Sequence, residues 1–234
     1  MTMDLNCDMG ELADVALEEA LMRSVTSANV ACGGHAGDAA SMERTVRLAR
    51  QYGVAVGAHP GYPDRANFGR LEMPLSSAQI ASAVADQIRA LADIAGELTH
   101  VKPHGALYNV AAKDAGVARA IGDGVASVGR ELVLVGLAGS AMLEVWQEMG
   151  FRTAAEGFAD RRYEPDGSLR SRKFADALIT SPGQAAAQAL RLAREGGTKT
   201  ICVHSDTPGS VRILAAVSEA LRSAGITLKS FLRD

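Results

Sequence analysis

The chain has 234 residues, of which 47% are hydrophobic and 22% are charged, and its formal net charge is -3. This length fits one large α/β domain or two small ones, and the hydrophobic fraction is ample for a buried core. No cluster of lysine and arginine predicts binding to nucleic acid or to an anionic membrane. No apolar run reaches the ~18 residues of a membrane span. Three scattered cysteines and an acidic N-terminus without an apolar leader predict a cytoplasmic protein.

Short apolar runs alternate with longer amphipathic ones along the chain. The apolar runs predict seven strands, at residues 3–7, 29–32, 54–59, 100–104, 132–137, 151–158 and 200–204. The clearest helical spacing follows the possible N-caps Ser76 and Ser77 and places Ile80, Val84, Ile88 and Leu91 on one face. Further helices are expected around Trp146 and Val217. Strands that alternate with helices predict a parallel sheet, either a barrel or a doubly wound open sheet. Because no linker interrupts the pattern, we expect a single domain over residues 1–234.

Polar motifs follow six of the seven predicted strands. In chain order they are DLNCDMGE, ANVACGGHAGD, GAHPGYPD, VKPHG, EGFADRRY and CVHSD. The carboxyl ends of parallel strands meet at one face of an α/β protein, and functional sites form there. We therefore expect these motifs to share one pocket. Two long irregular stretches, at residues 61–74 and 159–174, follow the third and sixth strands and are expected to contribute to function.

Strand alternation places polar side chains on the inner side of the predicted sheet. Asn6 and Asp8 share one side of the first strand, and Lys102 and His104 share one side of the fourth. Asp4 or Asp8 is expected to cap a turn. The three cysteines are expected to pack as small hydrophobic side chains. Four of the five histidines lie at strand ends, and we interpret them as site residues: His35, His59, His104 and His204.

Carboxylates, imidazoles and a few cations around one pocket suit hydrolysis by an activated water. His104 could take the proton from water while Lys102 stabilises the developing oxyanion. Alternatively, two histidines and one carboxylate could bind a divalent metal, with the ligands Asp8, His35 and His59. Sequence spacing leaves both possibilities open. The sequence lacks a nucleotide-binding loop of the GxxxxGK[ST] or GxGxxG type and the GxSxG elbow of serine hydrolases.

The six motifs, in this order between Asp4 and Gly209, resemble the LamB/YcsF family. This resemblance implies a seven-stranded, TIM-like (β/α) barrel of the glycoside hydrolase/deacetylase type. It also implies the 5-oxoprolinase reaction, in which 5-oxo-L-proline, ATP and two waters give L-glutamate, ADP and phosphate. The implied partners are the 5-oxoprolinase subunits B and C, which would use ATP to phosphorylate the lactam before this chain hydrolyses it. The missing nucleotide-binding loop agrees with that division of work.

The resemblance also assigns candidate roles to motif residues. The catalytic candidates are Asp8, His35, His59, Lys102 and His104. The substrate-binding candidates are Asn6, Arg70, Tyr108, Asp160, Arg161 and Asp206. Of these, Lys102 or Arg161 would pair with the substrate carboxylate or with the phosphate of the activated lactam. Tyr108 and Tyr163 would form part of the pocket wall.

The chain departs from the family pattern in a few places. The segment ELADVALEEAL is shorter than usual, Gly34 replaces a usual Phe, and Ser205 replaces a usual Gly. One alternative is therefore a relative that acts on another lactam or cyclic amide. A second is a partner-independent, metal-dependent amide hydrolase or carbohydrate deacetylase on the same barrel. A third is a scaffold that presents partner subunits, although a scaffold has no need of this set of Asp, His and Lys.

Overall fold

The structure is a computed structural model that describes residues 1–230. All seven predicted strands are present, and most differ from the prediction by one or two residues at their ends. They are β1 (Thr2–Met9), β2 (Ser27–Ala31), β3 (Ala55–His59), β4 (His100–Val101), β5 (Val133–Leu137), β6 (Thr153–Phe158) and β7 (Thr200–Cys202). A short eighth strand, β8 (Thr227–Leu228), was not predicted.

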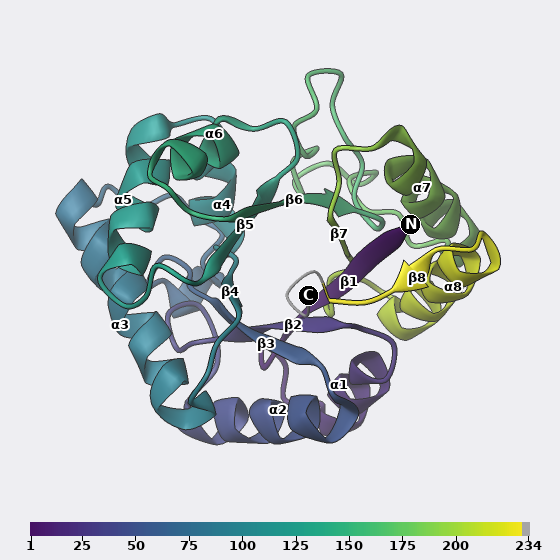
Figure 1. Ribbon diagram of the computed structural model, residues 1–234, viewed down its shortest axis with the longest axis horizontal. Helices are drawn as coiled ribbons and strands as arrows, with labels where there is room; N and C mark the ends of the chain where they lie inside the picture. The colour runs from purple at the N-terminus through teal and green to yellow at the C-terminus, as the bar shows by residue number, and fades with distance from the viewer. Residues whose placement is uncertain (231–234) are drawn as a thin grey trace.

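The strands form a closed parallel barrel. Strands β2 to β7 pair in sequence order, and β1 closes the ring by pairing with both β7 and β2 (Figure 1). The short β8 pairs with the start of β1, opposite Thr2 and Met3. The predicted TIM-like barrel is confirmed, and the doubly wound open sheet is excluded, because such a sheet would have two unpaired edges.

Helices surround the barrel in the connections between strands (Figure 1). They are α1 (Val15–Met22), α2 (Ala39–Tyr52), α3 (Ser77–Ala95), α4 (Gly105–Ala111), α5 (Ala115–Ala126), α6 (Ala141–Glu148), α7 (Pro182–Glu195) and α8 (Ser210–Ser223), with a 3-10 turn η1 (Arg65–Asn67). The predicted helix start is confirmed at Ser76, whose side chain accepts from the amide of Gln79 in a capping box. Ile80, Val84 and Ile88 are buried on its inner face, as expected from their spacing.

Side chains that alternate along the strands separate two environments. Those that point outward, such as Leu5 and Ile201, join the hydrophobic core between barrel and helices. Those that point inward from β1 are polar. Asp4 accepts hydrogen bonds from Thr26, Ser27 and Thr200, so the prediction that an aspartate here caps a turn is wrong for Asp4. It is also wrong for Asp8, which accepts from Asn29 and Lys102 across the barrel.

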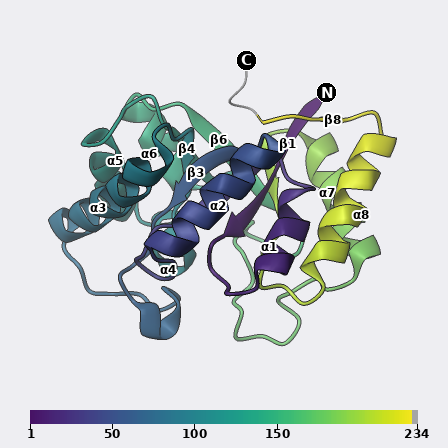
Figure 2. The same ribbon diagram turned by 90° about the horizontal axis from the view of Figure 1, so that it is seen from below.

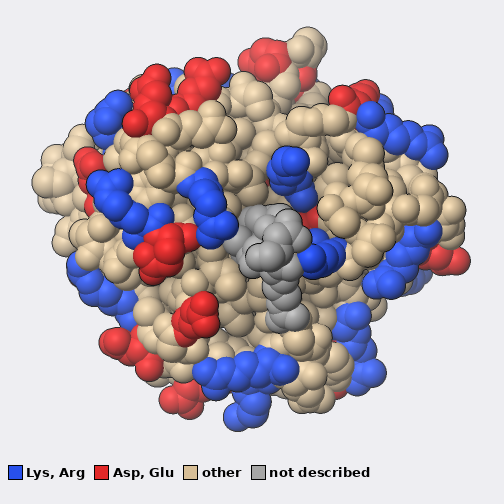
Figure 3. Space-filling view, in the orientation of Figure 1, with Lys and Arg blue, Asp and Glu red and all other residues tan. Residues whose placement is uncertain are grey.

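The two ends of the barrel differ. The N-terminus lies at one end, and the long loops after β3 and β6 lie at the other (Figure 2). At the N-terminal end, basic and acidic side chains are interspersed on the surface (Figure 3), and Asp4, Arg152 and Lys199 line a cavity of about 270 Å³. The strand-end motifs therefore lie at the opposite end, where the long loops gather. None of the helices within residues 1–230 has the length and apolar character needed to cross a lipid bilayer.

Candidate active site

A cavity of about 790 Å³ opens at the carboxyl ends of the strands. Its wall includes a side chain from the end of six different strands: Asp8, His59, Lys102, Leu137, Phe158 and His204. The predicted convergence of the motifs at one face is thus present in the structure. The volume lies in the range of ~300–1,000 Å³ that is typical of small-molecule sites.

Lys102 is the central charge on the floor of this cavity. Its side chain is buried, and its Nζ lies 3.0 Å from Asp8 Oδ1, 2.9 Å from Glu156 Oε1 and 3.1 Å from Cys202 Sγ. Burial alone would lower the pKa of Lys102, but the neighbouring Asp8, together with Glu156, outweighs it and raises the pKa well above its ordinary value. Lys102 therefore stays charged, and it holds two buried carboxylates beside it.

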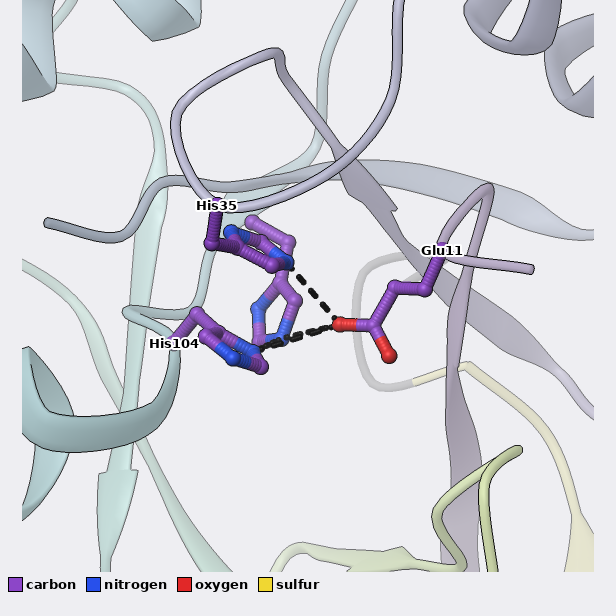
Figure 4. A group of neighbouring side chains, drawn as sticks. Glu11, His35 and His104 are labelled. Atoms are coloured by element: carbon purple, nitrogen blue, oxygen red, sulfur yellow. Dashed lines mark hydrogen bonds and ion pairs between the residues drawn. The ribbon is translucent and has the colours of Figure 1, made fainter. Parts of the chain in front are cut away.

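A second group of titratable side chains lies next to Asp8. It consists of Glu11 after β1, His35 after β2, His59 at the end of β3 and His104 after β4. Glu11 Oε1 lies 3.0 Å from His35 Nε2, 3.2 Å from His104 Nδ1 and 3.7 Å from His59 Nε2. Figure 4 shows Glu11 pointing toward the edges of the stacked rings of His35 and His104. We call these four residues the Glu-His group.

Two glycines let the loop after β3 pass close to the stacked rings. A Cβ at Gly61 would lie 2.9 Å from His35 Nδ1, and one at Gly69 would lie 2.7 Å from His35 Cβ. Gly69 also has φ +62°, a conformation that side-chain-bearing residues rarely adopt. Gly61 in the motif GAHPGYPD and the glycine at position 69 thus let the loop cover the Glu-His group.

His204 and Asp160 form a separate pair in the wall. Asp160 follows β6, is buried, and accepts hydrogen bonds from His204 N at 3.0 Å and from Thr207 Oγ1 at 2.5 Å. Burial would raise the pKa of Asp160, but His204 outweighs this effect and the net shift is downward. The carboxylate lies 3.1 Å from His204 Nδ1 and only accepts, so Nδ1 carries a hydrogen and the lone pair of the neutral ring is on Nε2. This pairing gives His204 the tautomer that a general base requires.

Arginine side chains provide positive charge at the outer part of the cavity. Arg161 is 5% exposed, donates to the carbonyl of Arg170, and its Nε has no hydrogen-bond partner within residues 1–230. Burial, with help from Arg172, lowers the pKa of Arg161 to about 10, which still leaves it charged at neutral pH. Arg70 and Arg172 both pair with Asp206. A buried guanidinium with an unused donor is suited to binding an anion.

The predicted site residues do not all contact the cavity. The wall includes Asp8, His59, Arg70, Lys102, His104, Tyr108, Arg161 and Asp206. His35, Asn6 and Asp160 are instead buried against residues of the wall. Asn6 donates to Glu156 and Thr200, and Asp160 contacts His204 Nδ1, so both side chains lie one layer behind the wall of the cavity.

The predicted metal ligands are also regrouped. Asp8, His35 and His59 were expected together, but the donor atoms that cluster with the two histidines come from Glu11 and His104. Asp8 Oδ2 lies 3.4 Å from His59 Nε2, and Asp8 belongs to a different cluster with Cys202 and His204. Burial would raise the pKa of Asp8, but His59 and Lys102 hold it well below its usual range.

Sequence reasoning missed several residues of the site. Glu11 stands inside the motif DLNCDMGE, three residues after Asp8, and was not singled out. Glu156 begins EGFADRRY, and strand alternation would have placed it with Phe158 on the inner side of β6. Arg172 lies in the long loop after β6, where no regular spacing predicts the direction of a side chain.

The comparisons with known proteins agree with this architecture. The LamB/YcsF family model matches residues 3–233. The A subunit of a 5-oxoprolinase from Chloroflexus aggregans is 50% identical over 249 residues, which cover 98% of this chain and 99% of that protein. The crystal structure of a lactam utilization protein from Thermus thermophilus superposes with a TM-score of 0.90 at 39% identity, covering 99% of this chain and 100% of that one.

A more distant structure shares the barrel alone. A family 4 carbohydrate esterase from Streptomyces lividans superposes with a TM-score of 0.55 at 16% identity, covering 97% of this chain and 91% of that one. The expected deacetylase type of barrel is therefore confirmed as a fold. Sequence, fold and strand-end motifs together show that the chain belongs to the LamB/YcsF family.

Proposed function

We propose that this chain is the A subunit of an ATP-dependent 5-oxoprolinase and hydrolyses the ring amide of 5-oxo-L-proline. Support comes from the name of its 50% identical relative and from the arrangement of the cavity. The observation that carries the proposal is Arg161, a buried cation with an unused donor that borders the same cavity as His59, His104 and His204. One cavity thus contains a group that can bind an anion and groups that can transfer a proton.

The substrate and its activated form are both anions. 5-Oxoproline carries one carboxylate, and phosphorylation of its lactam oxygen adds a phosphate. Arg161 and Arg172 line the cavity and can pair with such groups through charge-assisted hydrogen bonds. Phosphorylation by partner subunits B and C would consume ATP, which fits a chain that has no recognisable nucleotide-binding loop of its own.

Ring opening requires two waters in the proposed sequence. The first water adds to the ring carbon that carries the phosphate, the C–N bond breaks, and the ring nitrogen leaves as an amine after taking a proton. The second water cleaves the resulting acyl phosphate to the carboxylate and inorganic phosphate. His204, whose Nδ1 is held by Asp160 so that Nε2 is free to exchange a proton, is assigned to proton transfer. The Glu-His group is assigned to binding and activating the attacking water.

Lys102 takes a different role from the predicted oxyanion contact. An ammonium has three N–H donors, and Nζ of Lys102 already lies near Asp8, Glu156 and Cys202, with Asn6 Oδ1 a further 3.4 Å acceptor. We therefore assign Lys102 to positioning the carboxylates of Asp8 and Glu156. The stabilisation of negative charge on the substrate falls to Arg161.

The test is glutamate release from 5-oxoproline, measured with the purified chain alone and with subunits B and C and ATP. We expect glutamate only in the complete mixture. Arg161→Gln should lower kcat/KM by ~10–150-fold, the effect of losing a hydrogen bond worth ~1.5–3 kcal/mol to a charged group. Arg191→Gln is the matched control, because Arg191 lies on the exposed face of α7 and pairs with Glu195.

Two results would contradict the proposed reaction, and a third would contradict the role of Arg161. Hydrolysis of an amide or an acylated sugar by the chain alone, without ATP, would favour the partner-independent amide hydrolase or carbohydrate deacetylase. An inactive complete mixture with all three proteins folded would mean that the substrate is another lactam or cyclic amide. Equal activity of Arg161→Gln and Arg191→Gln would remove Arg161 from substrate binding.

A further inference from the structure

The Glu-His group has the donor atoms and the spacing of a metal site. Its four donor atoms, one carboxylate oxygen and three ring nitrogens, all lie within 4.8 Å of one another. We propose that Glu11, His35, His59 and His104 bind a divalent metal ion of the zinc class. This inference goes beyond the proposed function, because it depends on the geometry of the group and not on the identity of the lactam.

Hydrogen bonds to carbonyl groups fix the orientation of two of the rings. His59 Nδ1 lies 2.7 Å from the carbonyl oxygen of Lys102, and His104 Nε2 lies 3.0 Å from that of Phe68. A carbonyl only accepts, so both of these nitrogens carry hydrogen. The other nitrogen of each neutral ring therefore directs its lone pair into the group. Metal-binding histidines are oriented by outer hydrogen bonds of this kind.

The nitrogens of His59 and His104 that face each other are so close that their two lone pairs would repel unless a cation lay between them. His59 Nε2 and His104 Nδ1 are 2.9 Å apart, and Glu11 Oε1 lies 3.2 Å from the second of them. Three electron-rich atoms at this separation require a shared cation. It can be a metal ion or an extra proton on one of the rings, and the two differ in whether the site retains metal.

The contacts of Glu11 are close to the ligand spacing around a zinc ion, and binding would require the parallel rings of His35 and His104, now stacked 3.6 Å apart, to rotate toward it. Zinc bonds of ~2.0–2.1 Å to nitrogen and oxygen place neighbouring ligand atoms ~3.3 Å apart. The contacts from Glu11 Oε1 to the three histidines are 3.0, 3.2 and 3.7 Å. Three imidazoles and one carboxylate favour zinc and similar transition metals, whereas magnesium and calcium prefer oxygen ligands.

The other cluster of donor atoms is less suited to a metal. Asp8, Cys202 and His204 also offer donor atoms within 4.8 Å of one another. However, the buried ammonium of Lys102 lies 3.0 Å from Asp8 Oδ1 and 3.1 Å from Cys202 Sγ. A positive charge already occupies the centre of that cluster, and it would repel a second cation. The Glu-His group contains no lysine or arginine, and three of its residues line the cavity through which an ion would enter.

The test is direct metal binding by the untagged full chain, with no assay of turnover. The chain would be stripped with a chelator, dialysed against Zn²⁺ or Co²⁺, and analysed for metal content. Cobalt would also be followed by its visible absorption, which is strong in tetrahedral sites. We expect one ion per chain, a tetrahedral cobalt spectrum, and displacement of cobalt by zinc.

Three variants locate the ion. Glu11→Gln keeps the shape of the side chain but removes its charge, and His35→Gln removes one ring; each should weaken binding by more than the ~10–100-fold that loss of an outer partner of a metal ligand costs. His204→Gln is the matched control, because it removes a cavity histidine from the other cluster and should bind as the wild type does. Far-UV circular dichroism would establish that each variant is folded.

Several outcomes would overturn the proposal. If the wild-type chain retains no ion after dialysis, the shared cation is a proton. If only His204→Gln loses the ion, the metal belongs to the cluster with Asp8 and Cys202. If Glu11→Gln and His35→Gln are folded and bind normally, the ion is elsewhere. Because none of these measurements uses a lactam, failure of the proposed reaction would leave the result interpretable.

Discussion

Lys102 is the residue on which the charge balance of the site depends. One ammonium faces the carboxylates of Asp8 and Glu156, and all three side chains are at most 3% exposed. Removing one partner of a buried ion pair leaves the other charge uncompensated, which costs ~3–5 kcal/mol. We predict that Lys102→Met lowers the free energy of unfolding by about this amount, measured by urea denaturation.

A second substitution separates charge from packing in this prediction. Glu156→Gln removes one of the two carboxylates but keeps the volume of the side chain. The double variant Lys102→Met, Glu156→Gln should therefore be more stable than Lys102→Met alone. A double-mutant cycle measures this coupling as the difference between the effect of the double variant and the sum of the two single effects. If the two changes are simply additive, Lys102 acts through packing and the charge balance described here is wrong.

Residues on regular strands were predictable because alternation fixes their direction. Asn6, Asp8 and Lys102 were placed on the inner side from sequence, and all three are buried among the polar side chains of the barrel. Glu11 was missed because it follows the last paired residue of β1, and a turn has no period to extrapolate. The sequence placed three histidines of the Glu-His group in one site, but not their distances or their contact with Glu11, since the four residues come from four separate parts of the chain.

At the scale of elements, Gln87 connects helix α3 to the loop that covers the site. Its side-chain amide donates to the carbonyl of Gly61 at 2.8 Å and accepts from the amide of Gly61 at 3.0 Å. A Cβ at Gly34 would lie 2.1 Å from Gln87 Oε1, so the space for this contact depends on the glycine that replaces the usual Phe. The departure at position 34 is thus tied to a specific contact between elements.

We predict that Gln87→Ala weakens this connection. It would leave a buried donor and acceptor of Gly61 unpaired, at a cost of ~1–3 kcal/mol, and would speed hydrogen exchange at the amide of Gly61. Gln79→Ala is the comparison, because Gln79 bonds Ser76 in the exposed cap of α3. Unchanged exchange at Gly61 would show that the loop is held in place by the glycine contacts alone.

Element boundaries were less predictable than element types. The fourth strand was expected over 100–104, but β4 ends at Val101. The chain nevertheless stays beside β3 beyond that point, because Lys102 N donates to Ala58 and His104 N to Pro60. The strand β8 was missed because two residues show no alternation. Both differences arise where pairing is set by a neighbouring segment and not by local sequence.

At the scale of the whole molecule, closure of the barrel joins its two halves. The alternating pattern allowed a barrel or an open sheet, and the choice depends on β1 pairing with both β2 and β7, which no local pattern encodes. The outward side chains of the strands and the inner faces of the helices form one large hydrophobic cluster. Opening the ring anywhere would expose part of that cluster and the polar side chains inside the barrel.

We therefore predict that residues 1–234 unfold in urea as one cooperative unit. The single Trp146 lies buried on α6, where its Nε1 donates to the carbonyl of Ala118, and its fluorescence reports that side of the barrel. The buried thiols of Cys7 and Cys202 lie on the paired strands β1 and β7, and their reactivity reports the closure of the ring. Fluorescence, thiol reactivity and far-UV circular dichroism should share one midpoint, as a two-state transition requires. If Trp146 becomes exposed at lower urea than the thiols, the half of the barrel that carries α6 unfolds separately and the chain is not a single domain.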